Sequence, residues 1–236
     1  MSKKLILFIG GTVELGAQGI PAIKALLSPG KDGEPSPYAV RVVTRDPSNW
    51  RAAELQNLGC ELVTGSVKDL PSIYNALEGV YGAFVNTDGF TIGEKEELFA
   101  AFRIYELAKE RGVKHYVWSN LDYMSKKGNF DPKYRCGHYD AKGRVADFLK
   151  AQPSAKTVEE GTVWSILTSG PYMDMLLNGL FLPRRQPDDS LVWDLPLGQG
   201  KYSGVDLEVA SEMVLLDGAA AKLQSRAEAS PPLAAF

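Results

Sequence analysis

The sequence has few of the residues from which metal sites and disulfide frameworks are built. Its 236 residues include two cysteines, Cys60 and Cys136, and two histidines, His115 and His138. These four residues lack the spacing of metal ligands, and one pair of cysteines makes no disulfide framework. We therefore expect no bound metal and a reducing, cytoplasmic environment.

Long apolar runs and an excess of one charge are also missing. No apolar stretch approaches the roughly 20 residues that a membrane-spanning helix needs, and we expect no signal peptide. The formal net charge of −3 offers no basic surface for nucleic acid or an anionic membrane. A hydrophobic share of 44% is nevertheless enough for a packed core. These features predict a soluble, cytoplasmic globular protein.

Short apolar runs alternate with amphipathic segments along most of the chain. The runs are typical of strands buried on both faces, and the segments between them of helices. The expected strands are residues 5–9, 39–44, 61–63, 82–86, 115–119 and 164–168, and the expected helices are residues 19–27, 50–58, 71–77, 94–111 and 138–150. This alternation predicts an α/β fold with a doubly wound parallel sheet of the Rossmann type.

A glycine-rich turn, residues 10–19, joins the first strand to the first helix. Glycines let the backbone approach a pyrophosphate, and a helix N-terminus holds its charge. One register of the motif uses Gly10, Val13 and Gly16; the other closes the turn on residues 16–19. We prefer the second, because it leaves Pro21 near the helix start, where its missing N–H costs little. The residues expected to line this cofactor turn are Gly10, Gly11, Gly16, Ala17 and Gly19.

Polar side chains follow several of the expected strands. Arg45 ends the second strand, where an arginine can pair with the 2′-phosphate of NADP; a surface pair with Asp46 is the alternative. Ser66 follows the third strand and either meets the adenine or makes a turn. Asn86 and Thr87 end the fourth strand and are expected to point into the crevice.

The later motifs carry a family resemblance. Residues 16–19, 44–47, 116–119, 138–142 and 169–173, spread over residues 4–200, resemble the NmrA-like family of atypical short-chain dehydrogenase/reductases. The resemblance implies an NADP(H) cofactor whose pyrophosphate is held by Thr12, Gln18 and Gly19, with its 2′-phosphate on Arg45. It also implies that Thr87 lies beside the nicotinamide ribose and that Pro171 and Tyr172 lie against the nicotinamide.

The catalytic residues depart from the wider superfamily, which pairs a tyrosine with a lysine four residues later. Here the pair is His138 and Lys142, and Tyr139 is turned about 100° round the helix. Lys142 is expected to hold the ribose, and Ser119, Tyr123 or His138 to steady or protonate the substrate oxygen. His138 is either a general acid or a structural residue at the helix start. Tyr123 and Lys127 share the spacing, but we place them in a long loop, residues 121–137.

The end of the chain is shorter than the resemblance implies. We expect residues 1–170 to form an NADP-binding Rossmann domain and residues 171–236 a reduced substrate-side lobe, with an alanine-rich helix at residues 219–229. The site is then open, or a protein partner completes it. The expected function is NADPH-dependent reduction of a small apolar carbonyl or enone metabolite. The alternatives are a weakly catalytic NADP(H)-sensing regulator and a catalyst of a non-redox rearrangement or cyclisation.

Overall fold

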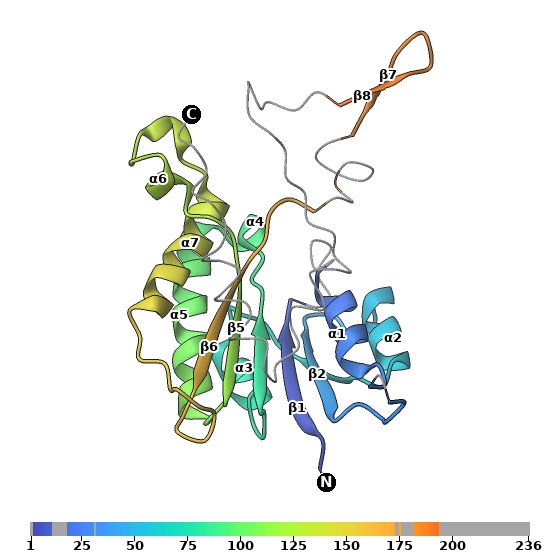
Figure 1. The fold of residues 1–236 in the computed structure, drawn as a ribbon, viewed down its shortest axis with the longest axis vertical. Coiled ribbons are helices and arrows are strands. Elements are labelled where there is room, and N and C mark those ends of the chain that lie inside the picture. Colours follow the sequence, from blue (N-terminus) through green and yellow to red (C-terminus); the bar gives the residue numbers. More distant parts are fainter. Residues whose placement is uncertain (1, 11–17, 31, 173–174, 176–181, 194–236) are drawn as a thin grey trace.

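One six-stranded parallel sheet organises the chain (Figure 1). The structure, a computed structural model, describes residues 2–10, 18–30, 32–172, 175 and 182–193. The strand order is β3-β2-β1-β4-β5-β6, so the expected doubly wound α/β fold is confirmed. The strands are β1 (Lys4–Ile9), β2 (Tyr38–Thr44), β3 (Glu61–Thr64), β4 (Gly82–Val85), β5 (His115–Asn120) and β6 (Val163–Thr168).

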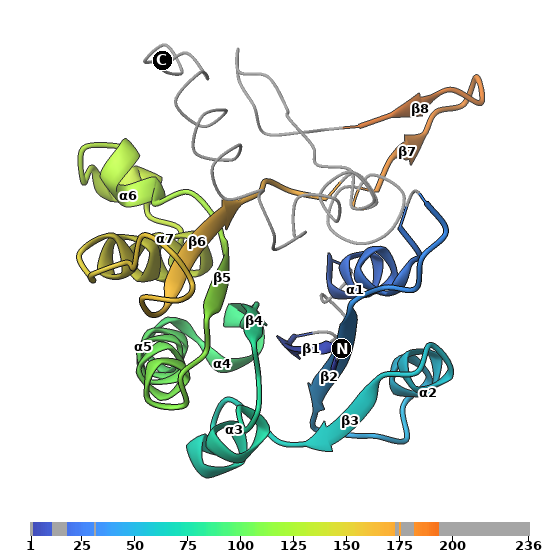
Figure 2. The same cartoon turned by 60° about the horizontal axis from the view of Figure 1, so that its bottom comes forward.

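Helices cover both faces of this sheet (Figure 2). On one face lie α1 (Gly19–Leu27) and α2 (Trp50–Asn57), and on the other lie α3 (Leu70–Ala76), α5 (Glu94–Glu110) and α7 (Gly137–Lys150). The apolar run of β1 serves both cores, because Ile6 and Phe8 pack with α1 whereas Leu7 and Ile9 pack on the opposite side. Burial on both faces explains why this strand is apolar at successive positions.

The structure corrects the expectation of a structureless loop over residues 121–137. This segment contains the short helix α6 (Met124–Lys127) and the 3-10 helix η2 (Pro132–Tyr134). The fully buried carboxylate of Asp140 on α7 accepts hydrogen bonds from the backbone N–H of Ser125, at 2.8 Å, and from its hydroxyl, at 2.5 Å. This contact with a distant helix stabilises a turn that local patterns do not reveal.

The described residues beyond β6 include an antiparallel pair, β7 (Arg184–Arg185) and β8 (Leu191–Val192), which the sequence did not lead us to expect. The division at residue 170 and the reduced lobe stay predictions. Gly11, Thr12, Gly16, Ala17 and the alanine-rich segment lie outside the described residues. In the part of the chain that is described, every helix is too short or too polar to cross a bilayer.

Candidate functional site

The carboxyl ends of β1, β2 and β4 meet at one edge of the sheet. Ile9 pairs with Val43 of β2 and with Val85 of β4, so the residues that follow these strands lie side by side. Between β1 and β4 the strand order reverses, which is where open α/β sheets bind ligands. Gly10 has a φ of +96°, and a Cβ there would collide with the carbonyl of Asn86. Only glycine fits this close approach of the two strand ends.

A first cavity of about 150 Å³ lies on the β2 and β3 side of this point. Among its lining residues are five predicted cofactor residues and the cation Lys68; the five are Gly10, Arg45, Ser66, Asn86 and Thr87. Arg45 is exposed and makes no ion pair with any described residue, and Asp46 instead accepts hydrogen bonds from Ser48. The surface pair of Arg45 with Asp46 is therefore not formed.

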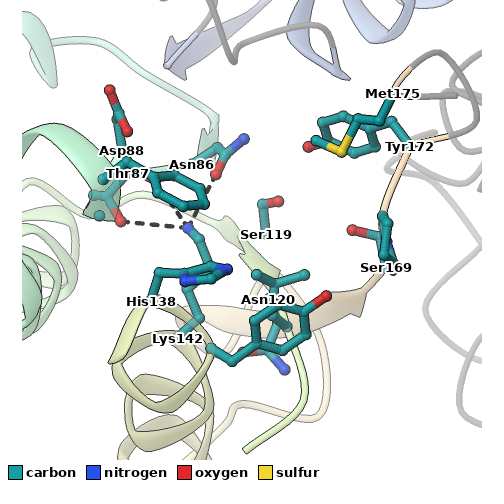
Figure 3. A pocket seen from close by; sticks show the side chains of 16 residues that line it. Asn86, Thr87, Asp88, Ser119, Asn120, His138, Lys142, Ser169, Tyr172 and Met175 are labelled. Atoms are coloured by element: carbon teal, nitrogen blue, oxygen red, sulfur yellow. Dashed lines mark hydrogen bonds between the residues drawn. The ribbon is translucent and has the colours of Figure 1, made fainter. Parts of the chain in front are cut away.

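A second cavity of about 250 Å³ lies on the β5 and β6 side (Figure 3). Its lining residues are Asn86, Thr87, Asp88, Gly89, Phe90, Ser119, Asn120, Leu121, His138, Tyr139, Lys142, Ser169, Gly170, Pro171, Tyr172 and Met175. Three of them, Asn86, Thr87 and Asp88, also line the first cavity. The two cavities therefore adjoin at the end of β4 and form one crevice across the switch point.

Lys142 lies where the two cavities meet. Its amine donates hydrogen bonds to the Asn86 side chain, at 3.0 Å, and to the Thr87 carbonyl, at 2.9 Å (Figure 3). It also forms an ion pair, at 3.2 Å, with the carboxylate of Glu97 on α5. Burial lowers the pKa of Lys142, and the charge of Glu97 partly opposes this effect. Sequence reasoning missed Glu97, although it shares the apolar stripe of α5 with Ala101.

His138 lies one turn before Lys142, at the start of α7. Its ring stacks on Phe90 of the short helix α4 (Gly89–Ile92), with centroids 4.2 Å apart. Burial lowers the pKa of His138 below its usual 6.5, and the charge of Lys142 lowers it further. At neutral pH the imidazole is therefore mostly neutral.

Ser119 and Gln18 join the glycine turn to the second cavity. The hydroxyl of Ser119 donates a 2.7 Å hydrogen bond to the side-chain oxygen of Gln18, and both residues are buried. The amide nitrogen of Gln18 is also buried and has no hydrogen-bond partner among the described residues. A buried donor without an acceptor is costly, so this group is suited to a bound acceptor at the start of α1.

The model of the NmrA-like family matches residues 2–216. The chain belongs to this family. The expected resemblance is thereby confirmed over nearly the whole chain.

Two NmrA-like relatives illustrate how far the likeness extends. The NmrA-like family domain-containing oxidoreductase malD of Malbranchea aurantiaca is 31% identical over 165 residues, which cover 65% of this chain and 47% of the relative. The corresponding oxidoreductase hkm9 of Aspergillus hancockii is 28% identical over 161 residues, covering 66% of this chain and 45% of the relative. The chain thus spans about half the length of these curated relatives.

Solved NmrA structures share the fold. One of Nmra, a negative transcriptional regulator, superposes with a TM-score of 0.68 at 20% identity, covering 90% of this chain and 60% of that one. A structure of NmrA in complex with NADP gives a TM-score of 0.58 at 20% identity, covering 81% of this chain and 53% of that one. At these identities the likeness establishes the fold.

Tyr123 of this NmrA-like chain does not line the second cavity. Its hydroxyl accepts a 2.9 Å hydrogen bond from Arg144, and the amine of Lys127 pairs with Asp122 at 2.7 Å. Tyr123 and Lys127 lie at the two ends of α6, so helical geometry does relate them, contrary to expectation. Their polar groups are engaged elsewhere, which argues against Tyr123 as a proton donor.

Pro171 and Tyr172 line the second cavity, and Tyr172 lies across it from Lys142 and His138 (Figure 3). The hydroxyl of Tyr172 is hydrogen-bonded to the side chain of Asn86, which also accepts from Lys142. Burial raises the pKa of Tyr172, so its hydroxyl keeps its proton at neutral pH. The cavity therefore holds a tyrosine linked to the lysine through Asn86, although the two are far apart in sequence.

Proposed function

We propose that this NmrA-like protein binds NADP(H) across the two cavities and reduces a small apolar carbonyl or enone. The observation that carries the proposal is the pair of cavities that adjoin at Asn86 and Thr87. The first cavity is lined in part by the cations Arg45 and Lys68, which suit a ribose phosphate. The other contains Lys142, and although half of its lining residues are polar, most of its lining surface is apolar, which suits an apolar substrate.

Several groups of the chain fit a dinucleotide. The unpartnered amide nitrogen of Gln18, beside the start of α1, can donate to the pyrophosphate. Arg45 and Lys68 are placed to bind the 2′-phosphate, and Ser66 lies in the same cavity for the adenosine. Lys142 and Thr87 are available to the nicotinamide ribose, and Pro171 and Tyr172 to the nicotinamide ring. Among these residues, Lys68 is the one that the sequence did not lead us to expect.

When bound, the reduced nicotinamide supplies a hydride to the substrate. The chain must then stabilise the charge that develops on the substrate oxygen and provide a proton. The buried ammonium of Lys142 supplies positive charge beside the second cavity. Two groups compete as the proton donor. His138 donates when protonated, which its lowered pKa confines to acidic solution, whereas Tyr172 holds its proton at neutral pH.

Titration of the protein with NADPH and NADH, followed by nucleotide fluorescence, tests the binding part of this proposal. We expect saturable binding that favours NADPH. Oxidation of NADPH with a panel of apolar ketones and enones, measured by absorbance, tests the reductase part. His138→Gln and Tyr172→Phe then identify the donor, because the variant that lacks it loses turnover while retaining cofactor binding.

A second candidate function is NADP(H) sensing through a protein partner. It is favoured by His138, which occupies the place of the superfamily tyrosine and is mostly neutral at neutral pH. One solved structure of the same fold is that of Nmra, a negative transcriptional regulator. Tight NADPH binding without oxidation across the panel, together with a partner captured only when NADPH is present, would support this role over the reductase.

A further inference from the structure

Glu97 is a fully buried carboxylate that lies behind the second cavity rather than in its lining. Its Oε1 receives the hydroxyl of Thr87 at 2.5 Å and the ammonium of Lys142 at 3.2 Å. Its Oε2 is buried, has no hydrogen-bond partner within the described ranges, and contacts Gly89 so closely that a Cβ there would overlap it. A buried carboxylate is costly unless it is paired, and in the described part of the chain Lys142 is the cation that pairs with Glu97 and offsets that cost.

Besides the Thr87 hydroxyl at 3.5 Å, three acceptors surround the ammonium of Lys142, which has three donors. Two acceptors belong to the crevice, the Thr87 carbonyl at 2.9 Å and the Asn86 side chain at 3.0 Å. The third is Glu97, from the helix behind. The amine also lies 4.9 Å from the centre of the Trp118 ring. Lys142 is therefore held between a carboxylate on one side and the end of β4 on the other.

We propose that Glu97 is a positioning residue, which keeps Lys142 charged and fixes its amine at the junction of the two cavities. Glu97 touches neither cofactor nor substrate and acts through Lys142. In catalysis this inference rests on the proposed reductase function. The effect of Glu97 on the charge and position of Lys142 is a property of the cofactor-free protein, so it can be tested independently of any catalysis.

The charges around Lys142 support this assignment. Burial lowers the pKa of Lys142, and the nearby carboxylates of Glu97 and Asp88 oppose that effect. His138, one turn away, is the other titratable group that interacts with this amine, and its own pKa is lowered by it. Without the charge of Glu97, mainly Asp88 remains to oppose the lowering of the Lys142 pKa by burial. The amine therefore loses its proton at a lower pH.

The test measures the titration of Lys142 in the cofactor-free protein. Its midpoint is followed by NMR of isotope-labelled lysine side chains and by the pH dependence of acetylation at Lys142, read by mass spectrometry. In Glu97→Gln, which keeps the shape and an acceptor for Thr87, we expect the midpoint to fall by about one unit or more. Acetylation below both midpoints then becomes about tenfold faster. Glu96→Gln, an exposed carboxylate on the same helix, is the matched control and should change neither.

Turnover provides a second measurement. If NADPH oxidation is observed, Glu97→Gln should lower kcat and move the alkaline limb of its pH profile downward by as much as the Lys142 midpoint moves. A merely structural role of Glu97 would reduce the amount of folded enzyme and leave that limb in place. Such an unmoved limb would contradict the proposal.

Gly89→Ala provides an independent perturbation if Glu97→Gln does not fold. The added methyl group overlaps the carboxylate of Glu97 and must displace it, while every polar group is retained. The Lys142 midpoint should again fall. An unchanged midpoint in a folded Glu97→Gln or Gly89→Ala protein overturns the proposal. If the unmodified protein fails to bind NADPH but the Lys142 midpoint follows Glu97, the proposed function fails and the pairing stands.

Discussion

Replacing Arg45 with alanine should reduce the preference for NADPH over NADH. Arg45 and Lys68 line the same cavity, and Arg45 is exposed and forms no ion pair with any described residue, so its charge is available to a phosphate. Hydrogen bonds to charged groups contribute about 1.5–3 kcal/mol. Because Arg45 is exposed and Lys68 remains, we use the lower end of this range, which corresponds to about a tenfold loss of NADPH affinity.

Fluorescence titrations of both nucleotides measure this effect. Binding of NADH should stay within about twofold in Arg45→Ala, because NADH lacks the phosphate that the guanidinium contacts. Lys68→Ala should cost about threefold, and the preference should shrink as salt is added. Lys150→Ala, a cation at the far end of α7, is the control and should change neither affinity. An equal loss of NADPH and NADH binding in Arg45→Ala would refute the assignment of the 2′-phosphate to this cavity.

Three further predictions follow from single side chains. The pKa of His138 is lower in the folded protein than the unfolded value of about 6.5. The unfolded state therefore binds its proton first, and the free energy of unfolding falls as pH drops through 6.5. Between pH 7 and 5, the melting temperature of His138→Gln should fall less than that of the unmodified protein. Asp140→Asn weakens the charge-assisted hydrogen bonds from Ser125 and should lower the free energy of unfolding in urea by about 2–3 kcal/mol. If an exposed Asp→Asn variant lowers it by the same amount, the contact with Ser125 does not stabilise the fold. Gly10→Ala should weaken both stability and NADPH binding, because its Cβ collides with the Asn86 carbonyl; wild-type affinity would contradict the role given to this turn.

The strands and main helices could be predicted because their signals are local. A parallel strand buried on both faces is apolar at successive positions, as in β1, and an amphipathic helix repeats its apolar residues within one segment, as in α5. Alternation of the two then restricts the fold to a doubly wound sheet. The helix α6 escaped this reasoning because it is four residues long and depends on Asp140 from another helix.

The candidate site was predictable only in part. Strand ends identify residues that meet at one edge, so Arg45, Asn86 and Thr87 were found from their positions. Tyr123 was chosen on residue type alone, and its hydroxyl instead bonds to Arg144. Lys68 was overlooked because an exposed lysine in a turn has no pattern of its own.

By itself the sequence determined the order of the six sheet strands and the main helices between them, the family, and the glycine that the end of β1 requires, since each depends on a local pattern of residues. Only the tertiary structure decided which side chains pair across the crevice. Glu97 with Lys142, and Ser119 with Gln18, come from separate elements that the sheet brings together. Such pairs leave no periodic trace along the chain, because they depend on the register and packing of distant segments. The chemistry of the site is therefore fixed by packing, although its location is fixed by the strand ends.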